Sequence, residues 1–236
     1  MGQLGTKAAT TEVASARVHT WALAATAALG WALFTLTILH AISSFDPIAD
    51  PISRYAFTDT GQGMLEASLL SFAVGLVAVR GALLAAGLAV SRTATILIVV
   101  ATTGLVAAAL FPATFTEDID PVSGLIHQYA SLLTFLSLPG IAVCLLDSTR
   151  GVEELRRTRR MLARLVWAAL SGLVLFGLSY LADNLALGFA PLTAALSLLD
   201  AVPVGLLQRV VFLLDFLLLA GLLVLAHRAA RSTARA

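Results

Sequence analysis

Six long apolar stretches dominate the chain, and polar residues gather in the short segments between them. The stretches cover about residues 20–42, 65–90, 93–113, 125–146, 161–182 and 205–227. A helix rises 1.5 Å per residue, so about 20 residues cross the roughly 30 Å of hydrocarbon in a bilayer. The stretches are continuously apolar, whereas the strands of a membrane barrel alternate over about ten residues. The pattern predicts an all-α integral membrane protein with a bundle of six transmembrane helices.

Composition agrees with this class, because 59% of the residues are hydrophobic, only 12% are charged and the mean hydropathy is +0.93. A further apolar run, 191–202, is too short to span, and we expect it to form a short outer interfacial helix. The sequence then divides into a flexible tail (1–16), a transmembrane domain (17–228) and a basic tail (229–236).

The charged residues predict how the bundle is oriented. With six spans, twelve of the fifteen basic residues fall on one side of the membrane, while nine of the fourteen acidic residues fall on the other. Loops rich in Lys and Arg stay in the cytoplasm. We therefore expect a multi-pass protein of the cell membrane with both termini cytoplasmic. The net charge of +1 conceals this asymmetry.

Three different short motifs lie where the spans meet the acidic side of the membrane. They are Phe45-Asp46-Pro47-Ile48-Ala49-Asp50-Pro51-Ile52-Ser53 followed by Gly61, Phe111-Pro112-Ala113 with Gly124-Leu125-Ile126-His127, and Gly205-Leu206-Leu207-Gln208-Arg209. Through these motifs the chain resembles the membrane family known as domain of unknown function 998, over roughly residues 20–228. The resemblance implies a polytopic fold and marks these three segments as site positions, without implying a chemistry. The chain differs from the usual family pattern at Ala49-Asp50, where a basic residue is common, and at Gln208, where an acid is common.

His127 is the first candidate for proton transfer. It opens the fourth span near the acidic face, and Asp118 and Asp120 lie in the short loop before it. A carboxylate there would orient the imidazole as an acid–base pair. The alternative is structural, with His127 capping its helix or bonding a neighbouring carbonyl group.

Two other groups of polar residues leave several interpretations open. His40 ends the first span on the same side as His127, so zinc held by the two histidines and nearby carboxylates is an alternative, as are two haems bound by histidines at opposite helix ends. No fixed metal-ligand spacing is present, and we assign no metal and no cofactor. Within the spans, Arg80 and Asp215 lie at similar expected depths, which predicts a buried ion pair.

Two functions compete on this basis. The first is a membrane-embedded enzyme of lipid or isoprenoid metabolism, a cyclase or isomerase, that works by metal-free general acid–base chemistry at the outer face. The second is a transporter of small molecules or lipids, or a membrane accessory protein, in which the same charges line a path. The expected partner is a lipid or hydrophobic small molecule and not nucleic acid; the oligomeric state is left open. For the enzyme, the candidate catalytic residues are His127, Asp118, Asp120, Asp46, Asp50 and Asp183, and the candidate substrate-binding residues are Arg54, Arg209, Ser53, Tyr55 and Asp215.

Overall fold

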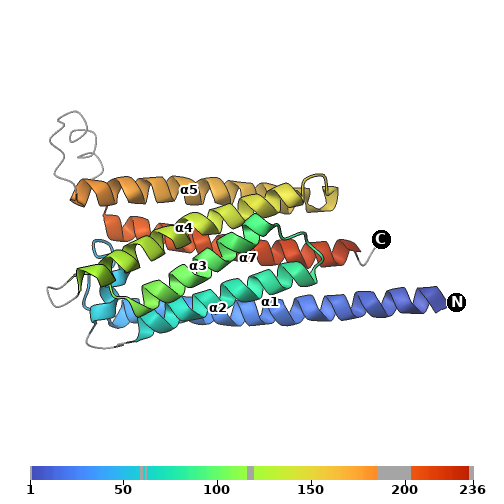
Figure 1. Cartoon of the computed structure of the whole chain (residues 1–236), viewed down its shortest axis with the longest axis horizontal. Helices are drawn as coiled ribbons and strands as arrows, with labels where there is room; N and C mark the ends of the chain where they lie inside the picture. The colour runs from blue at the N-terminus through green and yellow to red at the C-terminus, as the bar shows by residue number, and fades with distance from the viewer. Residues whose placement is uncertain (1, 59–60, 62, 116–119, 185–202, 234–236) are drawn as a thin grey trace.

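The structure is a computed structural model that describes residues 2–58, 61, 63–115, 120–184 and 203–233. In this part of the chain, six long helices run side by side in the order of the sequence (Figure 1). They are α1 (Gly2–Ile42), α2 (Met64–Ala85), α3 (Arg92–Leu110), α4 (Pro121–Ser148), α5 (Arg156–Asn184) and α7 (Val204–Thr233). Each contains a stretch long and apolar enough to cross a membrane. The predicted all-helical, multi-pass membrane fold is confirmed.

Helix boundaries follow local chemistry. Asp120 caps α4 by accepting a hydrogen bond from the backbone N–H of Val122, and Ser91 caps α3 in the same way through Ala94. α2 ends at Ala85, five residues before the predicted end at 90, because Gly87 adopts a left-handed conformation (φ 74°) that terminates the helix. α4 continues through Pro139, which lies inside the helix.

Both ends of the chain extend further as helix than expected. α1 begins at Gly2, so residues 2–16 continue the helix past the first span, and α7 runs to Thr233. Ala, Gln, Lys and Glu in the first segment favour helix. The proposed interfacial helix at 191–202 lies outside the described residues.

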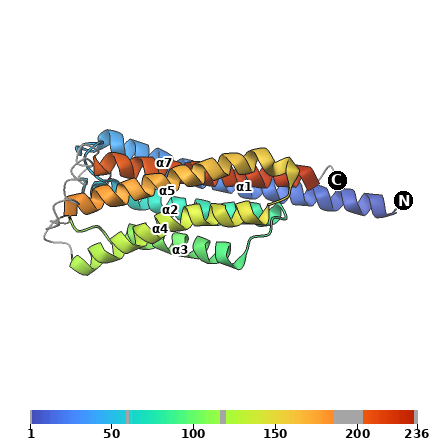
Figure 2. The ribbon, with the colours of Figure 1, turned by 90° about the horizontal axis from the view of Figure 1, so that it is seen from above.

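Helix α7 packs against four other helices. It contacts α1, α2, α4 and α5, whereas α3 packs mainly on α4 and α2 (Figure 2). Its buried face includes Leu218, Leu219, Leu222 and Leu225, none of which is exposed. Residues on α7 are therefore placed to join the chemistry of several helices.

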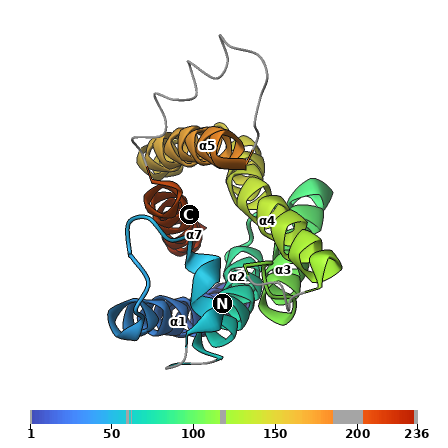
Figure 3. The same cartoon turned by 90° about the vertical axis from the view of Figure 1, so that its left-hand side faces the viewer.

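The two ends of the bundle differ. Both chain termini and the α4–α5 connection lie at one end, here called the terminal end (Figure 1). The other, here called the loop end, carries the short helix η1 (Ile52–Phe57), which lies across the ends of α1, α2 and α7 (Figure 3). The expected site segments are all at the loop end.

Candidate functional site

The 46–53 loop folds as a closed turn held by its two aspartates. Asp46 Oδ1 accepts hydrogen bonds from the N–H groups of Ile48 (2.7 Å) and Ala49 (3.2 Å), while Asp50 Oδ2 accepts one from the N–H of Asp46 (2.9 Å). The hydrogen bonds from Ile48 and Ala49 lower the pKa of the exposed Asp46 carboxyl, and the positive charge of Arg209 adds to the effect. Asp46 and Asp50 thus shape the loop, and neither lines a cavity of the site.

This loop is seated directly on the start of α7. The carbonyl oxygens of Ile48, Ala49 and Asp50 approach Gly205 so closely that an added Cβ atom would lie 2.4–2.8 Å from them. Gln208, largely buried, accepts a hydrogen bond from the N–H of Ile52 at 2.6 Å through its Oε1 atom. Only glycine allows this close approach of two backbones.

Arg209 ties the loop, α7 and η1 together. Its Nη1 atom donates to the carbonyl oxygens of Asp50 (2.7 Å) and Gly205 (2.8 Å), and its Nη2 atom donates to the Tyr55 hydroxyl (2.7 Å). The guanidinium also lies 5.4 Å from the centre of the Tyr55 ring. A guanidinium has five N–H groups, so two remain without a partner among the described residues.

Tyr55 is also hydrogen-bonded to His40 at the end of α1. Its hydroxyl lies 2.6 Å from His40 Nδ1, and its ring is almost wholly buried, at 1% exposure. Because the arginine can only donate, the hydroxyl oxygen is an acceptor there, and one proton is shared between Tyr55 Oη and His40 Nδ1. The three residues form a continuous chain, Arg209–Tyr55–His40, which we call the relay.

The relay lies at one end of a groove between α1 and α7. The groove has a volume of about 210 Å³, and apart from the relay and Thr37 its lining is apolar, with Leu36, Phe212 and Phe216 among its residues. Two further lining residues, Leu33 and Leu213, are 44% and 53% exposed, so the groove opens at the lipid-facing surface of the spans. Moving from the relay toward the other end of the bundle, the lining changes from polar to apolar over about 10 Å, the rise of seven residues.

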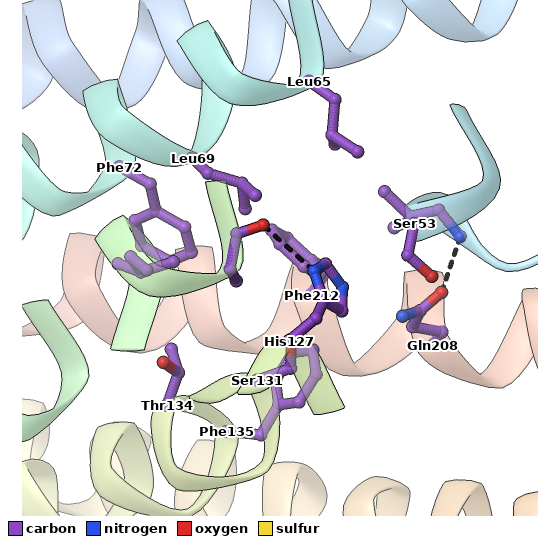
Figure 4. A pocket seen from close by; sticks show the side chains of 13 residues that line it. Ser53, Leu65, Leu69, Phe72, His127, Ser131, Thr134, Phe135, Gln208 and Phe212 are labelled. Atoms are coloured by element: carbon purple, nitrogen blue, oxygen red, sulfur yellow. Dashed lines mark hydrogen bonds between the residues drawn. The ribbon is translucent and has the colours of Figure 1, made fainter. Parts of the chain in front are cut away.

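His127 lines a second, smaller cavity of about 30 Å³ inside the bundle (Figure 4). Its Nδ1 atom donates to the carbonyl oxygens of Phe111 (2.8 Å) and Ala108 (3.0 Å) at the end of α3. The Ala108 carbonyl lacks a helical partner because Pro112, four residues on, has no N–H. The neutral ring therefore keeps Nε2 as an acceptor.

The Nδ1 atom of His127 thus bonds neighbouring carbonyl groups, as the structural alternative predicted. The expected pairing of His127 with Asp120 is not made, because Asp120 caps α4. Ser53, Ser131 and Gln208 line the cavity with it. Its volume accommodates about one or two water molecules and no lipid. Ile52 and Phe212 line both this cavity and the groove, so they form the wall between them.

Arg54 lies apart from these two cavities. Arg54 pairs with Asp50 and lies over the ring of Phe45, on the exposed side of the loop. Asp118 falls outside the described residues, as does the side chain of Asp183. Among the described residues no cluster of His, Cys, Asp and Glu has the form of a metal site.

The predicted ion pair between Arg80 and Asp215 is wrong. Asp215 is 1% exposed, and neither of its carboxylate oxygens has a hydrogen-bond partner among the described residues; Arg80 Nε is likewise buried without one. Counted from the starts of α2 and α7 at the loop end, Arg80 lies about 24 Å deep and Asp215 about 17 Å deep. This offset of about 7 Å along the helices exceeds the roughly 4 Å that an ion pair allows.

The relay was missed by sequence reasoning, although its members were noted singly. Tyr55 and Arg209 were expected to bind substrate, but His40 was considered only as a metal or haem ligand. Its pairing with Tyr55 depends on how a loop with two prolines, Pro47 and Pro51, folds back. The signal that was available is Gly205 beside Arg209, since a glycine at a helix start permits a close approach by another segment.

Residues 24–226 match the model of the family described as "Protein of unknown function (DUF998)". This match covers most of the chain, and the chain belongs to that family. No curated protein and no solved structure matches it.

Proposed function

We propose that this member of the family is a membrane-embedded enzyme that acts on a lipid or isoprenoid by general acid–base chemistry, with the relay as its proton-transfer site. The observation that carries the proposal is the position of the relay. Arg209, Tyr55 and His40 form the polar end of a groove that is otherwise nearly all apolar and opens between α1 and α7. Such a groove suits an amphipathic molecule whose chain stays in the bilayer.

Each member of the relay has a distinct part. The two free N–H groups of Arg209 bind an anionic or polar end of the substrate. Tyr55 and His40 share a proton that can leave toward the substrate and be replaced from it, which is what an isomerisation needs: one C–H bond is broken, another is formed, and no oxidant or reductant takes part. In a cyclisation the proton is added to one carbon and lost from another, with the same balance.

His127 is the candidate for a second proton donor or acceptor. Its Nε2 atom is left free by the bonds at Nδ1, and only the wall of Ile52 and Phe212 stands between its cavity and the groove. A rotation of the Phe212 side chain would join the two spaces. The expectation that His127 acts in catalysis is retained in this form, as part of the proposal.

The proposal can be tested before the substrate is known. Proton-transfer isomerisation or cyclisation in D2O places deuterium on carbon, so the protein is incubated in D2O with lipids extracted from its own membrane. We expect one lipid species to gain deuterium, as measured by mass spectrometry. Tyr55→Phe should slow this labelling by about 100-fold or more, the usual contribution of a general acid or base.

Tyr129→Phe is the matched control, because Tyr129 is 61% exposed on α4 and the same atom is removed. Labelling that is unaffected by Tyr55→Phe would assign the chemistry elsewhere, and His127→Gln then tests the second site. If no lipid is labelled by the wild-type protein, the enzyme proposal fails.

A transporter is the second candidate, and Asp215 is the observation that favours it. Its carboxylate is buried in a span and has no hydrogen-bond partner among the described residues, which is typical of a group that carries protons. In that case proteoliposomes should take up protons on addition of the transported molecule, and Asp215→Asn should abolish uptake while labelling in D2O is absent.

A further inference from the structure

A further cavity lies at the terminal end of the bundle, far from the relay. It has a volume of about 640 Å³ and lies between the end of α4 and the start of α5. Four arginines line it, Arg150, Arg156, Arg159 and Arg160, and we call it the arginine pocket. The proposed function makes no use of it.

The charges of the arginine pocket are only partly balanced. Arg150 pairs with Asp147 and Arg156 pairs with Glu153 from η2 (Glu153–Leu155). Arg159 and Arg160 have no salt bridge in the part of the chain that the structure describes, and the Nε atom of Arg159 is buried without a hydrogen-bond partner. Asp147 is the one carboxylate in the lining against four guanidinium groups, so the pocket attracts an anion.

The other lining residues are apolar and lie on the bilayer side. Val143 and Leu146 belong to the last two turns of α4, and Ala163 lies two turns into α5. Val143 is 48% exposed, so this wall opens toward lipid. The cavity therefore has a basic rim at the membrane interface and an apolar side toward the hydrocarbon.

Retention of basic loops in the cytoplasm requires arginines at this end of the bundle, but it does not require a cavity. Arg157 and Arg164 satisfy that rule equally well and do not line the pocket. What sets the other four apart is that they face one hollow, together with apolar residues from two helices.

We propose that the arginine pocket binds the phosphate group of an anionic phospholipid from the leaflet at the terminal end. A guanidinium pairs with phosphate oxygens through two parallel hydrogen bonds, and basic pockets between helices suit charged lipid head groups. The apolar wall of Val143, Leu146 and Ala163 then contacts the start of an acyl chain. A soluble phosphate compound would use the same arginines but would gain nothing from this wall.

Trp167 provides a reporter beside the pocket. It is 71% exposed and follows Ala163 by four residues and Arg160 by seven, so it lies on the same face of α5. A variant with Trp21→Phe and Trp31→Phe keeps this tryptophan alone. The variant is reconstituted in phosphatidylcholine vesicles, where a brominated lipid that binds next to Trp167 quenches its fluorescence.

We expect brominated phosphatidylglycerol to quench Trp167 with an apparent affinity at least about fivefold higher than that of brominated phosphatidylcholine, the contribution of one arginine near an anionic lipid. Replacing Arg156, Arg159 and Arg160 with Gln should remove this preference. The matched control replaces Arg92, Arg228 and Arg231 with Gln, which removes the same charge from exposed positions at the same end, and it should keep the preference.

Should the triple variant of the pocket fail to fold, Ala163→Phe gives the same test, because it fills the pocket without changing any charge. A preference that survives both variants, or that the control loses equally, would overturn the proposal in favour of general surface charge. Displacement of the preference by millimolar inorganic phosphate at matched ionic strength would also overturn it, since the pocket would then belong to a soluble phosphate compound.

Discussion

The hydroxyl group of Tyr55 offers the sharpest energetic test of the relay. Tyr55→Phe removes one oxygen atom and keeps the ring, with its contacts to Arg209, Phe45 and His40. Two hydrogen bonds disappear at a site that is 1% exposed, and they leave Arg209 Nη2 and His40 Nδ1 without their partner.

The expected loss follows from the two partners. A hydrogen bond to a charged group contributes about 1.5–3 kcal/mol and one between neutral groups about 0.5–1.5 kcal/mol, which sets an upper range of about 2–4.5 kcal/mol. Hydrogen bonds between membrane helices average only about 0.6 kcal/mol, because the unfolded chain in the membrane finds other partners. We therefore expect Tyr55→Phe to lower the free energy of unfolding by about 1–3 kcal/mol.

The assay is unfolding by titration from a mild detergent into dodecyl sulfate, followed by circular dichroism. Tyr129→Phe, at an exposed position, should change the free energy of unfolding by less than about 0.5 kcal/mol. In a double-mutant cycle with His40→Ala, the two losses should be smaller together than their sum, because both remove the same bond. Equal effects of the two tyrosine substitutions, or strict additivity with His40→Ala, would refute the relay.

Four further predictions concern other parts of the molecule. Gly205→Ala should cost about 1–3 kcal/mol of stability and reduce binding in the groove, since its Cβ atom would meet three loop carbonyls; a melting temperature equal to wild type would contradict this. Asp215→Leu should raise the melting temperature if the carboxylate serves no bond in the fold, and a fall would show an unseen partner. In the folded protein the pKa of Asp46 lies below its ordinary value of 3.8, so Asp46 stabilises the fold above that pH and the stabilisation is lost as the pH falls through the folded pKa. Asp46→Asn keeps the acceptor oxygen but does not titrate, so it should reduce the dependence of the unfolding free energy on pH between about pH 5 and 3. An unchanged pH dependence in this range would contradict the prediction. Tags on both termini should be protected from external protease in intact cells, and cleavage of either would reverse the predicted orientation.

The sequence was sufficient for the fold because membrane spans leave few alternatives. Soluble proteins do not contain several apolar runs of about 20 residues in one chain. In hydrocarbon, each backbone N–H and C=O group of such a run needs a hydrogen-bond partner within the helix. Boundaries were less certain at 85–90, where the run stays apolar but Gly87 ends the helix by its backbone conformation. The apolar pattern alone does not contain that information.

The site was located from the sequence only as a region. The loop with Asp46 and Asp50, the start of α4 and the start of α7 were expected at one end of the bundle, and they lie there. Contacts between them depend on how a loop folds over helix ends, and spacing along the chain does not determine that. Asp120 illustrates the limit, because the same position suits a helix cap and a partner for His127, and the cap is what forms.

The predicted ion pair between Arg80 and Asp215 was wrong for a different reason. The starts of α2 and α7 at residues 64 and 204 were predicted to within one residue, but similar depth along two helices does not say which helix faces meet. An ion pair needs its charges within about 4 Å, so depth alone lacked the required resolution.

The position of a bound lipid tests most directly whether the relay is the substrate site. The protein is purified with its native lipids in nanodiscs, and its structure is determined by electron cryomicroscopy. We expect elongated density in the groove between α1 and α7, with its polar end within hydrogen-bond distance of Arg209 and of the Tyr55–His40 pair. A structure in which the groove is closed by side chains, or in which the lipid lies with its polar end at the opposite end of the groove, would rule out the relay as the substrate site.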